Sequence, residues 1–198
     1  MKALRCNSKN NQYMLTSYKA MFKWHGFMWK TSEAALQCAK TRTDEEFKFH
    51  ANKMRMYGAE AAKRYADVKI YTRDDWLDVQ EQMLLSITME KFKYNQSIAE
   101  QLLATGNLYI LYDTTDTHDN ILGRCDCKAC AKKRAENGFG NVLMLTRAMC
   151  RHEEKCIIEF EDKNGNQYVA DLRDYNSIQA VTRKMGVKTW FDVVRNIV

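Results

Sequence analysis

Proline is absent from this sequence of 198 residues, which holds only eight glycines. Turns must therefore be made by Gly, Asn, Asp or the backbone alone, and linkers built on proline are excluded. No apolar run approaches the roughly 20 residues that a membrane-spanning helix needs. The first eight residues contain no apolar stretch typical of a signal peptide. We therefore expect a cytoplasmic protein with no membrane partner.

Acidic residues are missing from the first 30 positions, which carry six Lys or Arg. Residues 151–198 carry eight residues of each sign, so the whole net charge of +6 lies in the first 150 residues. This excess favours a polyanionic ligand, either a dinucleotide or a nucleic acid. A solvated basic surface would have the same composition, so charge alone does not choose between them.

The hydrophobic pattern predicts a mainly helical α+β protein with a small mixed sheet. Residues 15–29 read as short strands or a hairpin, and residues 108–112 as a short buried strand. Helices are predicted over residues 33–40, 43–56, 59–66, 74–94 and 98–103, and another begins near Gly140. Residues 113–136 form a polar, Cys-rich loop.

The pattern changes after residue 150, which predicts a domain over residues 1–150 and an appendix over residues 151–198. Residues 156–160 and 168–170 flank an Asn164-Gly165 pair, the sequence of a β-hairpin turn. Short helices follow over residues 177–185 and 190–197. The appendix is therefore predicted to have ββαα order.

One predicted helix offers an acid, an amide and an amine in a row, at Glu33, Gln37 and Lys40. Residues four and three apart share one helix face. Spacing alone favours a polar stripe that faces solvent. The segments around this helix give it a second interpretation.

Six segments of the chain, in order, resemble the NADAR (YbiA-like) family. The family patterns are G-x-x-W-x-T-S-E-x-x-x-Q-x-x-K, R-x-x-W, K-F-x-x-N, L-L-x-T-G-(D/N), W-G-x-G and N-x-L-G-x-x-L-M-x-x-R. The matching residues are Gly26, Trp29, Thr31, Ser32, Glu33, Gln37, Lys40, Arg73, Trp76, Lys91, Phe92, Asn95, Leu102, Leu103, Thr105, Gly106, Asn107, Gly123, Asn137, Gly140, Leu143, Met144 and Arg147. The resemblance covers roughly residues 15–147.

The resemblance implies an N-glycosidase that acts on ADP-ribosyl or phosphoribosyl substrates and requires no cofactor for catalysis. Activities in the family include release of ADP-ribose from modified guanine in DNA and hydrolysis of phosphoribosyl intermediates of the riboflavin pathway. Breaking a C1′–N bond develops positive charge on the ribose, which a carboxylate can stabilise. By this resemblance Glu33 is the catalytic candidate. The substrate-binding set is Gly26, Trp29, Ser32, Gln37, Lys40, Arg73, Trp76, Gly123 and Asn137.

Within this set, Lys40 and Arg73 would hold phosphate oxygens, Gln37 a ribose hydroxyl or the base, and Trp76 would stack on the base. The basic first 150 residues favour modified nucleic acid over a small metabolite. By analogy, such an enzyme would reverse toxin-type ADP-ribosylation of DNA in a phage or a toxin–antitoxin pair.

The chain departs from the family at the W-G-x-G loop, where it reads Leu122-Gly123-Arg124-Cys125. An Arg stands where an acid is common, so Asp119 or Asp126 is the candidate for the second catalytic carboxylate. The altered loop also fits a different class of protein, a binding module that captures an ADP-ribose-type nucleotide without turnover.

Seven cysteines, an odd number without an export signal, are predicted to be reduced thiols. Three of them, Cys125, Cys127 and Cys130, lie within six residues of one another. They are candidates for three ligands of a structural Zn²⁺, with His118 or His152 as the fourth. A set of reduced cysteines without metal is the alternative.

Overall fold

The computed structural model describes residues 3–130, 137–151, 157–161, 165–171 and 175–187. The chain divides into two compact units, Met1–Thr146 and Arg147–Val198, and helix α6 (Gly138–Arg151) runs through the division. The predicted boundary at residue 150 falls in the last turn of this helix. Within the described residues, no helix is both long and apolar enough to cross a membrane.

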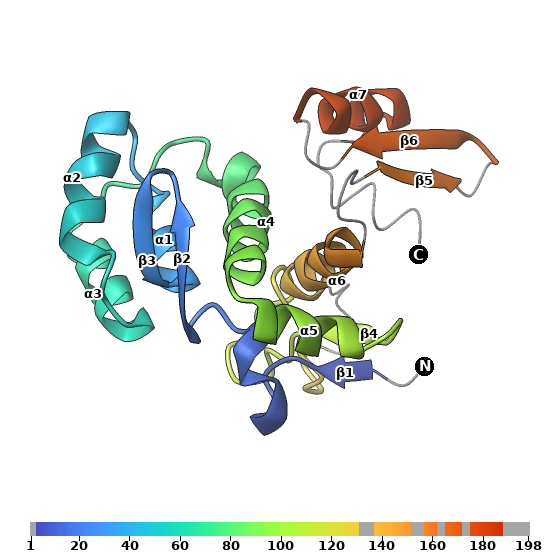
Figure 1. Cartoon of the computed structure of the whole chain (residues 1–198), viewed down its shortest axis with the longest axis horizontal. Helices are drawn as coiled ribbons and strands as arrows, with labels where there is room; N and C mark the ends of the chain where they lie inside the picture. Colours follow the sequence, from blue (N-terminus) through green and yellow to red (C-terminus); the bar gives the residue numbers. More distant parts are fainter. Residues whose placement is uncertain (1–2, 131–136, 152–156, 162–164, 172–174, 188–198) are drawn as a thin grey trace. The chain divides into compact units, whose positions relative to one another are not determined.

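A β-hairpin lies between the helices within residues 44–69 and the long helix of residues 76–94 (Figure 1). It joins β2 (Lys19–Trp24) to β3 (Phe27–Thr31) through a turn in which His25 and Gly26 both have positive φ. Two positive φ angles in sequence define the turn that matches strand twist, and glycine enters that region without cost. Alternate side chains of β2 are buried, as expected for a strand with one face on a core.

Three helices follow the hairpin in sequence. They are α1 (Ser32–Cys38), α2 (Asp44–Met54) and α3 (Ala59–Lys69). Helix α1 contacts α2, α3, β3 and the long helix α4 (Trp76–Tyr94), so it is enclosed by its neighbours. The hairpin and these helices share one apolar core: Phe22, Trp24, Trp29, Ala34, Ala35, Cys38, Ala39, Ala51, Met54, Ala62 and Ile87.

Threonine side chains begin two of these helices. Thr31 accepts from the backbone N–H of Ala34, and Thr43 accepts from that of Glu46. These bonds satisfy amide groups that have no partner inside the helix. The predicted capping box at residues 43–46 is only half formed, because the Glu46 carboxylate accepts from the N–H of Arg42.

In the remaining part of the first unit, the first strand of the chain pairs with a strand that follows the series of helices. Helix α5 (Gln96–Ala104) ends before Gly106, which has a positive φ, and β4 (Tyr109–Leu111) follows. Strand β4 pairs in parallel with β1 (Ala3–Arg5), a strand that the sequence pattern did not predict. A 3₁₀ helix, η1 (Lys9–Met14), connects β1 to the hairpin region.

The second unit contains β5 (Ile157–Glu161), β6 (Gln167–Asp171) and α7 (Tyr175–Met185). The strands pair antiparallel, Ile157 opposite Asp171 and Glu161 opposite Gln167. This agrees with the predicted hairpin, and Gly165 has the positive φ expected for its turn. The predicted helix over residues 190–197 lies outside the described residues.

The mainly helical α+β class is confirmed. The described strands make three separate two-stranded sheets, one parallel and two antiparallel, in place of the single small mixed sheet that the sequence pattern predicts.

Candidate active site

Glu33 is a buried carboxylate at the start of α1, 6% exposed. Its two oxygens accept hydrogen bonds from two side chains: Thr16 Oγ1 donates to Oε2 at 2.7 Å and Gln37 Nε2 to Oε1 at 2.8 Å. The ammonium of Lys63, on α3, lies 3.9 Å from Oε1. The positive end of the helix dipole also favours negative charge at the helix start. The carboxylate is therefore held in one orientation.

The interpretation of Glu33 and Gln37 as a solvent-facing stripe is wrong, because both are buried. Helix α1 is short and enclosed by other elements, so even its polar face lies inside the protein. Only Lys40, beyond the end of the helix, is partly exposed. The packing of neighbouring elements around α1 causes this burial, which the spacing of residues in the sequence does not indicate.

Two polar atoms beside the carboxylate have no hydrogen-bond partner within the described part of the chain. They are Gln37 Oε1 and Ser32 Oγ, and both are buried. A buried polar atom without a partner is costly and uncommon in native proteins. A bound molecule whose hydroxyl or amide groups reached these atoms would give them the partners that they lack.

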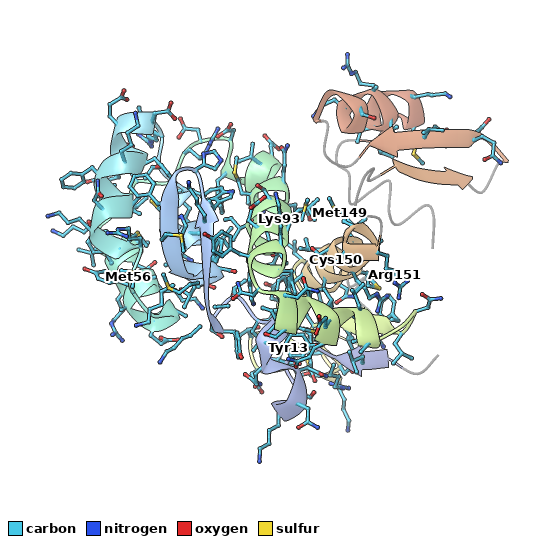
Figure 2. The ribbon with its side chains drawn as sticks, in the orientation of Figure 1. Tyr13, Met56, Lys93, Met149, Cys150 and Arg151 are labelled. Carbon is cyan, nitrogen blue, oxygen red and sulfur yellow. The ribbon has the colours of Figure 1, made fainter. Side chains whose placement is uncertain are left out.

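The segment that carries Thr16 is fixed by Lys91, on α4. The Lys91 side chain is 1% exposed, and its Nζ donates to the carbonyls of Tyr13 at 2.7 Å and Leu15 at 2.8 Å. Tyr13, labelled in Figure 2, packs edge-on against Phe92. Burial lowers the pKa of Lys91 to about 7. Since Thr16 O accepts from Glu33 N–H at 2.9 Å, this lysine supports the placement of Glu33.

Tyr112 follows β4 and holds two parts of the Cys-rich loop region. Its N–H donates to Asn137 Oδ1 at 2.9 Å, and its carbonyl accepts from Arg124 N–H at 2.9 Å. Burial raises the pKa of its phenol, and the charges of Cys6, Glu33 and Asp119 raise it further.

Lys40, Arg73 and Trp76 form a second group. The N–H of Arg73 donates to the Lys40 carbonyl at 2.8 Å, and the Lys40 ammonium lies 5.9 Å from the centre of the Trp76 ring. The Arg73 guanidinium makes two hydrogen bonds to the Asp75 carboxylate, at 2.5 and 2.8 Å. The structure brings the three predicted residues together, and it gives Arg73 an acidic partner that an anionic ligand would have to displace or share.

The surroundings of two other predicted substrate-binding residues, Trp29 and Gly26, indicate structural roles. Trp29 is fully buried in the core, and its indole N–H donates to the Trp24 carbonyl at 3.0 Å. Gly26 is exposed at the turn of the hairpin, where its φ of +81° requires glycine. The observed environment gives Trp29 a packing role and Gly26 a turn role.

Asn137 joins β4 to the Cys-rich loop. Its side-chain amide donates to the Ile110 carbonyl at 2.8 Å and to the Tyr109 hydroxyl at 2.9 Å, and it accepts from Tyr112 N–H at 2.9 Å. Its backbone N–H bonds the Gly123 carbonyl. A side chain at Gly123 would place Cβ 2.6 Å from the Tyr112 carbonyl, so this position is closed to other residues. Both residues shape the loop.

The predicted second carboxylates are held by the loop itself. Asp119 Oδ1 accepts from the N–H groups of Ile121 and Leu122, at 2.8 and 3.0 Å. Asp126 is exposed and pairs with Arg124 at 2.8 Å and with Arg5 at 3.2 Å. Of the two, Asp119 is the one whose charge reaches Tyr112.

The three predicted cysteine ligands gather around His118. The Nδ1 atom of His118 lies 3.3 Å from Cys125 Sγ, 3.4 Å from Cys127 Sγ and 3.8 Å from Cys130 Sγ. All four candidate ligand atoms lie within 4.8 Å of one another. Of the two predicted fourth ligands, His118 lies beside the thiols. The other, His152, lies outside the described residues.

Sequence reasoning did not find Thr16 or Lys63 as neighbours of Glu33. Thr16 lies in a connecting segment, and Lys63 is one of many exposed lysines with no distinctive spacing. Only the folded chain places these two residues near one carboxylate.

Comparison with known proteins identifies the family of this chain. The NADAR domain model matches residues 2–151. The solution structure of the E. coli protein YbiA is similar, with a TM-score of 0.63 and 20% sequence identity. The similarity covers 77% of this chain and 87% of that one. A search of the curated proteins found no match. Because the family model spans most of the sequence, the chain belongs to the NADAR domain family.

Proposed function

We propose that this protein is an N-glycosidase that hydrolyses the C1′–N bond of an ADP-ribosylated substrate, with ADP-ribosylated guanine in nucleic acid as the preferred one. Membership of the family supports a glycosidase-type function in general. The observation that carries the finer proposal is the buried Glu33 carboxylate, oriented by Thr16 and Gln37 beside two unpartnered polar atoms.

The proposed reaction replaces the bond from C1′ to the base nitrogen with a bond from C1′ to the oxygen of water. Positive charge develops on the ribose as the base leaves, and a fixed carboxylate lowers the energy of that state. Glu33 either stabilises this charge or accepts a proton from the attacking water. The base nitrogen takes up a proton, so the products are nucleic acid with its unmodified guanine and free ADP-ribose with a hydroxyl at C1′.

The surrounding residues suit the rest of such a substrate. Gln37 Oε1 and Ser32 Oγ are available to ribose hydroxyls or to the base. Lys40 would contact phosphate oxygens, and Trp76 offers an aromatic ring beside it. The basic charge of the first 150 residues favours a nucleic acid over a small metabolite.

The test is incubation of the purified full-length chain with DNA ADP-ribosylated on guanine, with free ADP-ribose followed by mass spectrometry. Three proteins are compared: the wild type, Glu33→Gln and Glu60→Gln. Glu60 is the matched control, because it also lies in the first turn of a helix but is exposed. Binding of free ADP-ribose is measured on all three by calorimetry.

We expect release by the wild type and Glu60→Gln, and binding without release by Glu33→Gln. Release by Glu33→Gln at the wild-type rate would show that this carboxylate is not catalytic. Binding by all three proteins without release would identify a binding module, which the altered Leu122-Gly123-Arg124-Cys125 loop would then explain. Release from phosphoribosyl flavin intermediates alone would replace the proposed substrate.

A further inference from the structure

We infer that His118, Cys125, Cys127 and Cys130 bind one structural Zn²⁺ that fixes the loop between β4 and α6. This inference does not depend on the proposed reaction. It rests on how four side chains from two turns of that loop are arranged around one point.

The interatomic distances suit tetrahedral zinc. Zn–S bonds of 2.3 Å and Zn–N bonds of 2.0–2.1 Å at tetrahedral angles place nitrogen and sulfur about 3.6 Å apart. The three observed distances from His118 Nδ1 to the sulfurs are 3.3, 3.4 and 3.8 Å. The side chains therefore already surround a space of the size that the ion needs.

Hydrogen bonding alone does not account for this arrangement. An imidazole nitrogen has one lone pair or one proton, so it forms one strong hydrogen bond. Here one nitrogen faces three sulfurs, and all three cysteines are free of disulfides. A cation at the centre gives each of the four atoms a partner.

Hydrogen bonds within the loop hold the backbone around these ligands. The N–H of Cys130 donates to the Cys127 carbonyl at 3.0 Å, which makes a tight turn between these two cysteines. The N–H of Cys125 donates to Asn120 Oδ1 at 3.0 Å. Hydrogen bonds around a metal site orient its ligands in this way.

The backbone at His118 is also specialised. Its φ is +56°, a left-handed conformation that residues other than glycine adopt at a cost in energy. The N–H groups of Thr117 and His118 both donate to the Thr114 carbonyl, at 3.1 and 2.8 Å, which turns the chain back toward the cysteines. A bond from His118 to a metal would compensate for the strained backbone.

The site lies on the loop that also holds Tyr112. Thr114 N–H donates to the Arg124 carbonyl at 3.0 Å, and Arg124 N–H donates to the Tyr112 carbonyl at 2.9 Å, so the two sides of the loop pair with each other. Asp119 follows His118 directly, and its Oδ1 accepts from the N–H groups of Ile121 and Leu122. Zinc would therefore hold Tyr112 and Asp119 in place without taking part in the chemistry.

The test is metal analysis of the full-length chain, purified without chelator, by inductively coupled plasma mass spectrometry. We expect about one zinc ion per chain in the wild type and in Cys150→Ser, a half-buried cysteine outside the cluster. Zinc should fall to background in Cys127→Ser and His118→Ala. It should return in His118→Cys, because four cysteines also form a tetrahedral zinc site.

A second measurement covers the case in which a variant does not fold. The wild type is stripped with chelator and titrated with Co²⁺, which replaces zinc in thiolate sites. Strong sulfur-to-cobalt absorption that saturates at one equivalent would support the site. Stripped wild type that binds neither Zn²⁺ nor Co²⁺ would overturn the inference, and so would zinc retained in both Cys127→Ser and His118→Ala.

Discussion

Replacing Lys91 with Met tests how the segment before the hairpin is held. The lysine amine donates to the carbonyls of Tyr13 and Leu15, and burial lowers its pKa from 10.5 to about 7. Methionine has a similar length and fills the same space, but it donates no hydrogen bond. The two carbonyls would lose their partner, at a cost of about 1–3 kcal/mol for each one that stays buried.

The contribution of Lys91 to the free energy of unfolding depends on pH, and the lowered pKa determines its sign. Between pH 7 and pH 10.5 the unfolded chain keeps the lysine proton and the folded chain does not. Unfolding then takes up a proton, so the free energy of unfolding rises with pH through this window and is flat below it. The lysine contributes a rise of about 2 kcal/mol between pH 7 and pH 9.

The assay is urea denaturation of the wild type and Lys91→Met at pH 7, 8 and 9, followed by circular dichroism. The upper limit avoids the opposite effect of Cys6, whose pKa burial raises from 9.0 to about 12. We expect the difference in free energy between the two proteins to grow with pH. An equal difference at all three pH values would refute the assignment of the lowered pKa to Lys91.

Three further substitutions test the packing around the site, each by urea denaturation. Asn137→Ala removes all three side-chain hydrogen bonds, including the one from Tyr112 N–H, and should destabilise the first unit by about 2–5 kcal/mol. A loss below about 1 kcal/mol, the cost of one exposed hydrogen bond, would argue against this role. Gly140→Ala would place Cβ 2.4 Å from the Ile110 carbonyl. Although alanine favours helices, this clash should lower the free energy of unfolding by about 1–3 kcal/mol. An unchanged free energy of unfolding would show that the backbone moves aside. Thr31→Ala removes the N-cap of α1 and should lower the free energy of unfolding by about 1 kcal/mol. Thr31→Ser keeps the hydroxyl and should retain most of that stability. Equal losses in the two variants would assign the effect to packing.

Much of the secondary structure could be predicted from local patterns. The long helix α4, the hairpin turn at His25-Gly26 and the caps at Thr31 and Thr43 all follow from short-range rules of periodicity and hydrogen bonding. The grouping of three cysteines and one histidine was visible for the same reason, since the four residues lie within 13 positions.

The surroundings of Glu33 depended on contacts between distant segments. Sequence order put Glu33 and Gln37 on one helix face, but only the packing of α2, α3 and α4 around α1 buried them. The pairing of β1 with β4 joins positions more than 100 residues apart, which no local pattern encodes. Local sequence therefore determined most of the elements, though not β1, and the cysteine cluster. The tertiary structure decided which polar groups lost contact with water, because burial is a property of the neighbours that fold around a residue.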